Sequence, residues 1–522
     1  GRRKPMKFLG WILFATLFST ISAGADDSAP VKIEAGLAQL FIDDYLIDSQ
    51  ENLERTLHQP TKDHGGNIPI IALPQDAFGE LPATLEANGS IVYDPNLKKM
   101  VMYALAFCSS LGDDRRWEKV RLYRFTSDDG LSWSDSEWVF PRSREDFLNR
   151  ETGEYATNID LFSCYYDDKD TDYPYKGLCW FANWGLKGEG SYLLKSKDGI
   201  LWERGPLIVD GCGGEGDTSM REIRQDGRTL VGAGDVTLVY KDPLRDRLLG
   251  IFKFTSPTTV ENGNRLRSRA YAFMDTIEKP FDIESIDHIE FLPPAQEEGG
   301  DHPHDEYYAS TGWRYESLWL GGLKVWHGQG DYPYSAAGCA YLKLAVSRDG
   351  LHWSKVPFKN EEGYPEVFIP NGPEGGNDGH NDGGYITEHS TGPIVSGDEL
   401  IYYYGCSSYG KNHGKDVRLS GGGIFRGRLR MDGFVSVDGG SLTTKPLKFE
   451  GEDLLLNSVG SNRIEVLSES GESLGSAQVN GDSIHHHVLF GDKTLGELAD
   501  GNPVRIKFDV LDGGKVYSFT VH

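Results

Sequence analysis

The chain has 522 residues, of which 79 are Asp or Glu and 53 are Lys or Arg, so its formal net charge at pH 7 is −26. A chain this acidic is a poor partner for nucleic acid, because that binding depends on Lys and Arg side chains that neutralise phosphates. Aromatic residues make up 11% of the chain, and there are 64 Gly and 24 Pro, which is typical of a protein built from strands and turns. The length is sufficient for more than one hydrophobic core, and we expect two domains.

Residues 6–25 are predicted to be a secretory signal peptide. Lys7 supplies a positive charge, residues 8–21 are apolar, and residues 23–25 form a cleavage site of small side chains. No other stretch stays apolar for the roughly 18 residues that a membrane-spanning helix needs. We therefore expect a secreted or periplasmic protein that has no membrane attachment after signal cleavage.

Strand-like segments follow the signal peptide, and helical periodicity is nearly absent. The first is the β-like run at residues 40–47. After it come five hairpins, each with a β-rich run, a turn and a second β-rich run. They cover residues 90–103, 160–180, 236–252, 315–326 and 392–404.

A Ser-x-Asp-Gly-x-x-Trp pattern occurs three times, beginning at Ser127, Ser196 and Ser347. Such a pattern favours a tight turn, because the Asp carboxylate accepts backbone N–H bonds, the Gly takes a positive φ and the Trp packs beneath. The second interval is about twice the first, so we expect a degenerate copy between them, and residues 269–275 fit it. Residues 430–434 are a further candidate. The resulting period of about 75 residues suits one four-stranded propeller blade with long loops.

The sequence therefore predicts an all-β protein with a five-bladed β-propeller over residues 36–440. We expect the run at residues 40–47 to complete the last blade and close the ring, which removes an exposed strand edge. From Lys445 the repeat ends and strands of alternating polarity begin, which predicts a small C-terminal β-sandwich over residues 445–522.

Acidic residues precede or begin the inner hairpins, and the inner strands of a propeller converge on its axis. Carboxylates crowded there raise one another's pKa, so that one can act as a general acid while another stays ionised as base or nucleophile. Each single acid has the alternative role of a turn or capping residue. The catalytic candidates are Glu86, Asp160, Asp235 and Glu316, and the candidates for substrate binding are Asp382, Glu388, His389, Arg314 and Trp313.

No cofactor is predicted. The loops at residues 302–306 and 377–384 are rich in His, Asn and Asp, and a structural calcium ion there is an alternative to a solvated Gly-rich loop. The six cysteines are widely spaced. Cys164 and Cys179 flank one hairpin, so either a disulfide between them or two buried thiols is consistent with the sequence.

The turns and hairpins over residues 36–440 resemble the five-bladed β-propeller glycoside hydrolases that include families 32 and 43. Residues 41–47 and 451–457 also resemble the opening and close of secreted bacterial proteins described as family-32-like. The resemblance implies three acids on the inner strands of the first three blades. Matched by blade position these are Glu86 as base or nucleophile, Asp160 as the residue that tunes a pKa or stabilises the transition state, and Asp235 as acid.

The chain departs from family 32 in two motifs. It lacks the Trp-x-Asn-Asp-Pro-Asn-Gly nucleophile motif and the Glu-Cys acid motif, so a fructan is not the expected substrate, and Glu316 or Glu388 is an alternative acid. Three functions are open: an exported glycosidase acting on an environmental polysaccharide or oligosaccharide, a carbohydrate-binding propeller without catalysis, and a glycoside phosphorylase. The last requires a basic anion pocket, for which Arg314, His389 and Arg221 are candidates.

Overall fold

The computed structural model describes residues 29–522 apart from 76, 109–110, 112, 184–186, 212–221, 226–227, 232–233, 260–264, 283–289, 293–304, 328–337 and 360–366. The predicted signal peptide at residues 6–25 lies outside the described residues, as do Cys212 and Arg221. Within the described ranges, no helix combines the length and the apolar character needed to cross a membrane.

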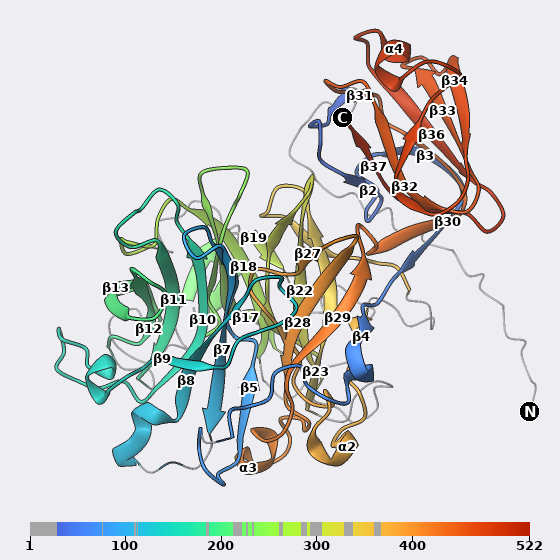
Figure 1. Cartoon of the computed structure of the whole chain (residues 1–522). Coiled ribbons are helices and arrows are strands. Elements are labelled where there is room, and N and C mark those ends of the chain that lie inside the picture. The colour runs from blue at the N-terminus through green and yellow to red at the C-terminus, as the bar shows by residue number, and fades with distance from the viewer. Residues whose placement is uncertain are drawn as a thin grey trace, which may run out of the picture.

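Five antiparallel sheets form the five blades of a β-propeller, which confirms the expected all-β fold (Figure 1). Blade one contains β5 (Ala83–Glu86), β6 (Ile91–Asp94), β7 (Lys99–Cys108), β8 (Val120–Ser127) and β9 (Glu137–Phe140). Blade two contains β10 (Asn158–Tyr166), β11 (Tyr175–Ala182), β12 (Gly190–Ser196) and β13 (Trp202–Asp210). Blade three contains β14 (Glu222–Gln225), β15 (Arg228–Val231), β16 (Leu238–Lys241), β17 (Leu248–Thr259), β18 (Arg265–Met274) and β19 (Glu290–Leu292).

The last two blades follow the same plan. Blade four contains β20 (Glu306–Ser310), β21 (Trp313–Tyr315), β22 (Leu318–His327), β23 (Cys339–Ser347), β24 (Trp353–Lys355) and β25 (Val367–Ile369). Blade five contains β26 (Thr387–Glu388), β27 (Ile394–Ser396), β28 (Glu399–Cys406), β29 (Gly423–Arg430) and β4 (Thr61–Lys62). Two short helices, α2 (Gly376–Gly379) and α3 (Lys415–Arg418), lie in loops of blade five.

The inner strand of each blade is interrupted partway along its length. In blades one, three, four and five it is divided into two short strands that pair with the same long neighbour, as β5 and β6 do with β7. In blade two the inner strand β10 is continuous, but its pairing with β11 shifts between Asp160 and Phe162. At these interruptions, residues of the inner strand lie outside the regular strand pairing, and they do so at a similar height along the axis in successive blades.

The Ser-x-Asp-Gly-x-x-Trp segments are tight turns that join the third strand of a blade to its fourth. In blade two, Asp198 Oδ1 accepts the backbone N–H groups of Ile200 and Leu201, each at 2.9 Å. Gly199 has a φ of 75°, and its carbonyl accepts a hydrogen bond of 2.6 Å from the hydroxyl of Tyr103 in blade one. The turn thus also ties two blades together. Corresponding Asp contacts occur at Asp129 and Asp349, and the carbonyl of Gly130 accepts from Tyr403.

The propeller core consists of five apolar clusters, each shared by two neighbouring blades. Between blades one and two, for example, Phe162 packs against Tyr103 and Trp202 with ring centroids 5.5 and 5.2 Å apart. Since every blade contributes to two clusters, the blades hold one another in a closed ring around the axis.

An eleven-stranded sheet forms the second unit, above the propeller in Figure 1. It has its own apolar cluster. Its strands are β1 (Val31–Lys32), β2 (Gln39–Leu40), β3 (Ile47–Leu57), β30 (Val435–Thr444), β31 (Leu447–Lys448), β32 (Leu454–Val459), β33 (Asn462–Ser468), β34 (Ser473–Val479), β35 (Ser483–Val488), β36 (Val504–Val510) and β37 (Lys515–Val521), with the helix α4 (Leu495–Ala499).

The prediction that residues 40–47 close the ring is wrong. β2 pairs with β37 and β3 pairs with β30, so this part of the chain joins the C-terminal sheet. The ring is closed instead by β4, whose residues Thr61 and Lys62 pair with β29 as the outer strand of blade five. The strands at residues 31–57 and 435–444 therefore extend the C-terminal sheet beyond the predicted range of 445–522.

Cys164 and Cys179 are both free, buried thiols, so the alternative of a disulfide between these two residues is excluded.

Candidate active site

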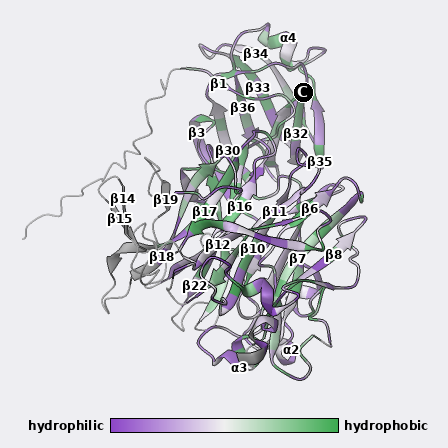
Figure 2. Cartoon of the chain, turned by 90° about the vertical axis from the view of Figure 1, so that its left-hand side faces the viewer, coloured by the Kyte–Doolittle hydropathy of each residue, from purple (hydrophilic) through white to green (hydrophobic). Residues whose placement is uncertain are grey.

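A cavity of about 310 Å³ lies at one end of the propeller. Its lining includes residues of α3, which stands at the end opposite to the C-terminal sheet in both views (Figures 1 and 2). All five blades contribute to the lining, so the cavity lies on the propeller axis. Among the described residues, the charged side chains that line it are Glu86, Asp160, Asp235, Lys119, Lys324, Lys411, Lys415 and Arg418.

Three of the four predicted catalytic acids meet in this cavity. Glu86 ends β5 of blade one, Asp160 lies on β10 of blade two, and Asp235 lies just before β16 of blade three. Each stands at the interruption of its inner strand. The periodic position in the blade thus brings together three acids that lie far apart in the sequence.

Asp160 lies at a β-bulge that directs it away from the regular ladder. The register of β10 shifts between Asp160 and Phe162, and Leu161 has a φ of 43°. A non-glycine residue in this left-handed region costs about 1–3 kcal/mol, and bulges of this kind re-aim side chains beside active sites. The Leu161 N–H donates to Asp160 Oδ1 at 2.8 Å, and both residues line the cavity.

The pKa values of Asp160 and Asp235 are displaced in opposite directions. Burial, and then the negative charge of Asp235, raises the pKa of Asp160 to about 7. Burial also works against ionisation of Asp235, but the charge and hydrogen bond of Lys253, whose Nζ lies 2.6 Å from Asp235 Oδ1, lower the pKa of Asp235. The cavity therefore holds one carboxyl that loses its proton only near neutral pH and one that has already lost it there.

Glu86 is the third acid and is almost fully buried. Asn88 Nδ2 donates to Glu86 Oε2 at 2.9 Å. Burial raises the pKa of Glu86, and the charge of Lys324 acts against that rise. Lys324 Nζ in turn donates to Thr387 Oγ1 at 2.6 Å, so its ammonium is fixed beside the acids.

Blades four and five supply a cationic face, which we define as Tyr308, Lys324, Tyr385, Lys411 and Arg418; all five line the cavity. Lys324 Nζ lies 4.2 Å from the centroid of the Tyr385 ring, and Lys411 Nζ lies 4.1 Å from that of Tyr308. The two tyrosine rings contact each other edge to face, with centroids 5.7 Å apart. Cation–π contacts of this kind stabilise charges that have left bulk water.

Sequence reasoning missed the cationic face. Lys411 and Arg418 lie in the long connection between β28 and β29 and belong to no repeated pattern. Tyr308 lies at a point where the pairing of β20 with β22 shifts, between Tyr307 and Ala309, and such bulges are common beside active sites, but this feature is visible only in the structure.

The structure does not bring Glu316 into the cavity lining. Glu316 lies in the turn between β21 and β22, with a φ of 49°. Its Oε2 accepts the backbone N–H of Ala38 at 3.0 Å. It therefore anchors the N-terminal segment, and its expected place at the axis is corrected.

Asp382 and Glu388 are both buried but also lie outside the lining of the main cavity. Asp382 Oδ2 lies 2.6 Å from Lys62 Nζ on the closing strand β4, and it accepts a hydrogen bond from Tyr404 at 2.9 Å. Glu388 borders an adjoining cavity of about 20 Å³, large enough for one water molecule. Asp382 therefore holds the closing strand in place through Lys62, whereas Glu388 borders a small cavity that shares lining residues with the candidate site.

The other predicted binding residues have structural contacts. His389 is buried between the carbonyls of Tyr103 and Tyr403, each at 3.2 Å, and burial lowers its pKa to about 4. Trp313 is 1% exposed and donates from Nε1 to Glu388 at 3.2 Å. Arg314 lies over the ring of Trp319 at 5.4 Å and does not line the cavity, so the anion pocket expected from Arg314 and His389 is not formed by them.

In the described part of the chain, no group of three or more His, Cys, Asp or Glu side chains is placed to hold a metal ion. Residues 302–304 of one candidate calcium loop lie outside the described residues. In the other loop, Asn377 Nδ2 donates to the carbonyl of Asn67 at 2.7 Å.

No protein-family model matches the sequence, and no curated protein matches it. The solved structures that resemble it include one described as a glycoside hydrolase, with 10% identity and a TM-score of 0.44 over 71% of this chain and 92% of that one. A family 43 arabinoxylan arabinofuranohydrolase from Bacillus subtilis has 11% identity and a TM-score of 0.39 over 87% and 99%.

A third similar structure comes from work on the GH130 family of mannoside phosphorylases and its glycoside hydrolases that target β-1,2 mannosidic linkages in Candida mannan. It has 13% identity and a TM-score of 0.43 over 74% of this chain and 96% of that one. Because the identities and TM-scores of these structures are this low, their activities do not establish the chemistry of this chain.

Proposed function

We propose that the protein is an exported glycoside hydrolase that cleaves a polysaccharide or oligosaccharide in the axial cavity. The observation that carries the proposal is the meeting of three acids in one axial cavity, where burial and the charge of Asp235 raise the pKa of Asp160 to about 7, while Lys253 lowers the pKa of Asp235 against the effect of burial. Glycoside hydrolysis requires one carboxylic acid and one carboxylate on either side of the scissile bond.

In this mechanism Asp160 is the general acid. It gives its proton to the glycosidic oxygen as the bond from that oxygen to the anomeric carbon breaks. Asp235 supplies the electron pair in one of two ways. It bonds to the anomeric carbon itself, and water, whose proton passes to the now ionised Asp160, then breaks that bond and releases the sugar; or it removes a proton from the water whose oxygen bonds to the anomeric carbon directly. Glu86, oriented by Asn88, accepts a hydrogen bond from a sugar hydroxyl.

These roles differ from those implied by blade position, in which Asp235 is the acid and Glu86 the base or nucleophile. The ion pair between Asp235 and Lys253 favours the new assignment, because an adjacent ammonium makes protonation of a carboxylate harder. Whether Asp235 acts directly or through water is decided by the anomeric configuration of the first product, observed by ¹H NMR during cleavage.

The test is a screen of the chain from residue 26 onward against purified plant and algal glycans, with released reducing ends as the measurement. Cleavage of at least one glycan supports the proposal. If affinity electrophoresis shows that a glycan binds, but none of the glycans tested is cleaved, the result contradicts the proposal. It then supports the alternative of a carbohydrate-binding propeller. Secretion is tested separately, by expressing the full chain and locating the protein and its N-terminus.

A further inference from the structure

The axial cavity has a positive lining although the chain as a whole is acidic. Among the described residues that line it, five are basic and three are acidic, whereas the chain carries a net charge of −26. The acids come from blades one to three, and four of the five bases come from blades four and five. The cavity thus has an acidic side and a cationic side.

On that side Lys324 lies beside Glu86, but Lys411 and Arg418 form no ion pair with a carboxylate among the described residues. Burial, followed by the charges of Arg267 and Arg418, lowers the pKa of Lys411 to about 7. Arg267 already has a carboxylate partner, because its Nη1 lies 2.7 Å from Glu306 Oε2. Lys411 donates a hydrogen bond to the hydroxyl of Tyr308, which does not neutralise its charge.

Two polar atoms on the cationic face have no hydrogen-bond partner in the part of the chain that the structure describes. Arg418 Nε and Tyr385 Oη are buried, and neither has a hydrogen-bond partner among the described residues. Both residues line the cavity. Buried donors of this kind cost free energy unless a ligand or water satisfies them, so the face presents unused donors together with unbalanced positive charge.

We propose that the cationic face binds an oxyanion beside the bond to be cleaved, so that the substrate is an acidic glycan bearing a carboxylate or sulfate group. Lys411 and Arg418 supply charge-assisted hydrogen bonds to the anion, Tyr385 donates from its hydroxyl, and Tyr308 contacts a sugar face. The neutral part of the same sugar faces Asp160 and Asp235. This inference rests on the proposed function and names its substrate class.

Free phosphate has the same oxyanion chemistry and is the other source to distinguish. In that case a phosphate oxygen bonds to the anomeric carbon, the glycosidic bond breaks, and Asp160 gives its proton to the leaving oxygen. The products are a sugar 1-phosphate and a shortened glycan, so the two sources differ in both requirement and product.

The experiment measures binding by calorimetry and cleavage by chromatography, using galacturonate oligosaccharides, sulfated and unsulfated galactose oligosaccharides, and inorganic phosphate. We expect an acidic oligosaccharide to bind, and its unsulfated or neutral counterpart to bind at least about ten-fold more weakly. If phosphate is the only oxyanion that binds, and a neutral oligosaccharide is cleaved only when phosphate is present, the oxyanion at the cationic face is free phosphate and not a group on the glycan. Binding of none of these oxyanions, or equal binding of neutral and acidic oligosaccharides, overturns the inference.

Lys411→Met and Arg418→Met are the informative variants, because each removes a charge but keeps most of the side-chain stem. Each should weaken binding of the oxyanion by about ten- to a hundred-fold. The matched control is Lys99→Met, in the strand β7 and outside the cavity lining, which should bind as the unchanged protein does. Unchanged binding in both cavity variants contradicts the inference, and thermal unfolding shows whether each variant is folded.

The two proposals fail in different ways. Cleavage of a neutral glycan without phosphate, abolished by Asp160→Asn, leaves the hydrolase proposal intact and overturns the oxyanion site. Binding of an acidic oligosaccharide that depends on Lys411 but is followed by no cleavage supports the oxyanion site and contradicts the hydrolase proposal.

Discussion

Burial raises the pKa of Asp160, and Asp235, an ionised group that Lys253 holds at 2.6 Å, raises it further. The two aspartates have the same side chain and line the same cavity, but among the described residues a cation contacts Asp235 and none contacts Asp160. The difference in partner gives them different protonation states near neutral pH, and the proposed division between acid and base follows from it.

The pH dependence of stability should reveal the protonated Asp160. Its pKa rises from 3.8 to about 7 on folding, so the folded protein holds a proton that the unfolded chain releases, and the free energy of unfolding falls as pH rises through this interval. Asp160→Asn removes that loss. We expect the variant to unfold at a higher temperature than the unchanged protein at pH 8, with a smaller difference at pH 4.5.

Thermal unfolding followed by circular dichroism at several pH values checks this expectation. Asp168→Asn, at a largely exposed carboxylate, is the control. Unfolding curves of Asp160→Asn that run parallel to those of the unchanged protein at every pH would show that Asp160 ionises normally.

Lys253→Met should move the acidic limb of the pH profile of kcat/KM. Without the ammonium, the pKa of Asp235 rises towards its ordinary value or above it, because burial then acts unopposed by Lys253. The base is consequently protonated at a higher pH, and activity begins to fall at a higher pH on the acidic side. A profile that keeps its acidic limb but loses height would contradict this role for Lys253.

Tyr103→Phe should destabilise the propeller without changing its chemistry. The variant loses the hydrogen bond to the carbonyl of Gly199, which joins blades one and two, and we expect a loss of about 1 kcal/mol in the free energy of unfolding. Urea denaturation measures the loss, with Tyr93→Phe as control because Tyr93 is 53% exposed. If the two variants are equally stable, the hydrogen bond between Tyr103 and Gly199 does not stabilise the packing of blades one and two.

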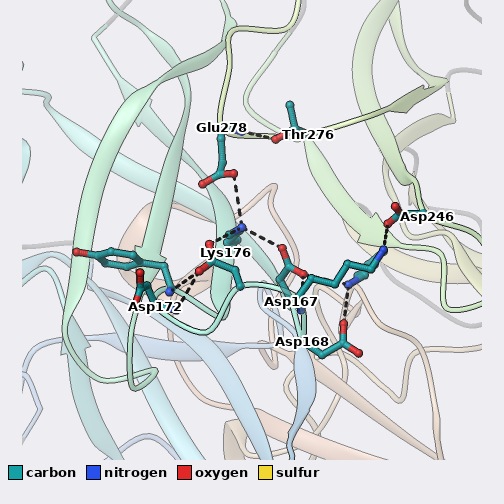
Figure 3. Close-up of polar contacts among 11 residues, drawn as sticks. Asp167, Asp168, Asp172, Lys176, Asp246, Thr276 and Glu278 are labelled. Atoms are coloured by element: carbon teal, nitrogen blue, oxygen red, sulfur yellow. Dashed lines mark hydrogen bonds and ion pairs between the residues drawn. The ribbon is translucent and has the colours of Figure 1, made fainter.

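Lys176→Met should also be destabilising, at a site remote from catalysis. Lys176 Nζ, on a side chain that is 4% exposed, lies within 2.9–3.5 Å of carboxylate oxygens of Asp167, Asp170 and Glu278 (Figure 3). Removing the cation leaves three carboxylates close together, and because they are partly exposed we expect a loss of about 1–3 kcal/mol. Calorimetric unfolding measures it; a variant as stable as the unchanged protein would show that water and counter-ions replace the lysine.

The repeat made much of the fold and part of the site predictable. The Ser-x-Asp-Gly-x-x-Trp turns and the inner hairpins fix the phase of each blade, and this phase placed Glu86, Asp160 and Asp235 at the axis. The same reasoning failed for Glu316, because this acid follows β21, the second piece of its inner strand, whereas Glu86 and Asp235 precede the second pieces β6 and β16. Glu316 therefore lies in the turn at the far end of its hairpin.

Other features leave no local pattern in the sequence. A strand-like run such as residues 40–47 shows a preference for extended backbone, but it does not show with which strand it pairs. The strand that closes the ring, β4, has only two residues, which is too short to recognise in a sequence. Lys411 and Arg418 come from a connection without a repeat. These two residues lie close to the acids only because the ring closes, and no pattern of neighbouring residues in the sequence predicts that contact.

The most direct test of the proposed hydrolase compares kcat/KM of the unchanged protein with that of Asp160→Asn, Asp235→Asn and Glu316→Gln on a glycan that the screen identifies. We predict a loss of about 10²–10⁴-fold for each aspartate variant, and nearly unchanged kcat/KM for Glu316→Gln, whose amide oxygen still accepts the Ala38 N–H. Full activity in both aspartate variants, or a comparable loss in Glu316→Gln, would contradict catalysis by the axial acids.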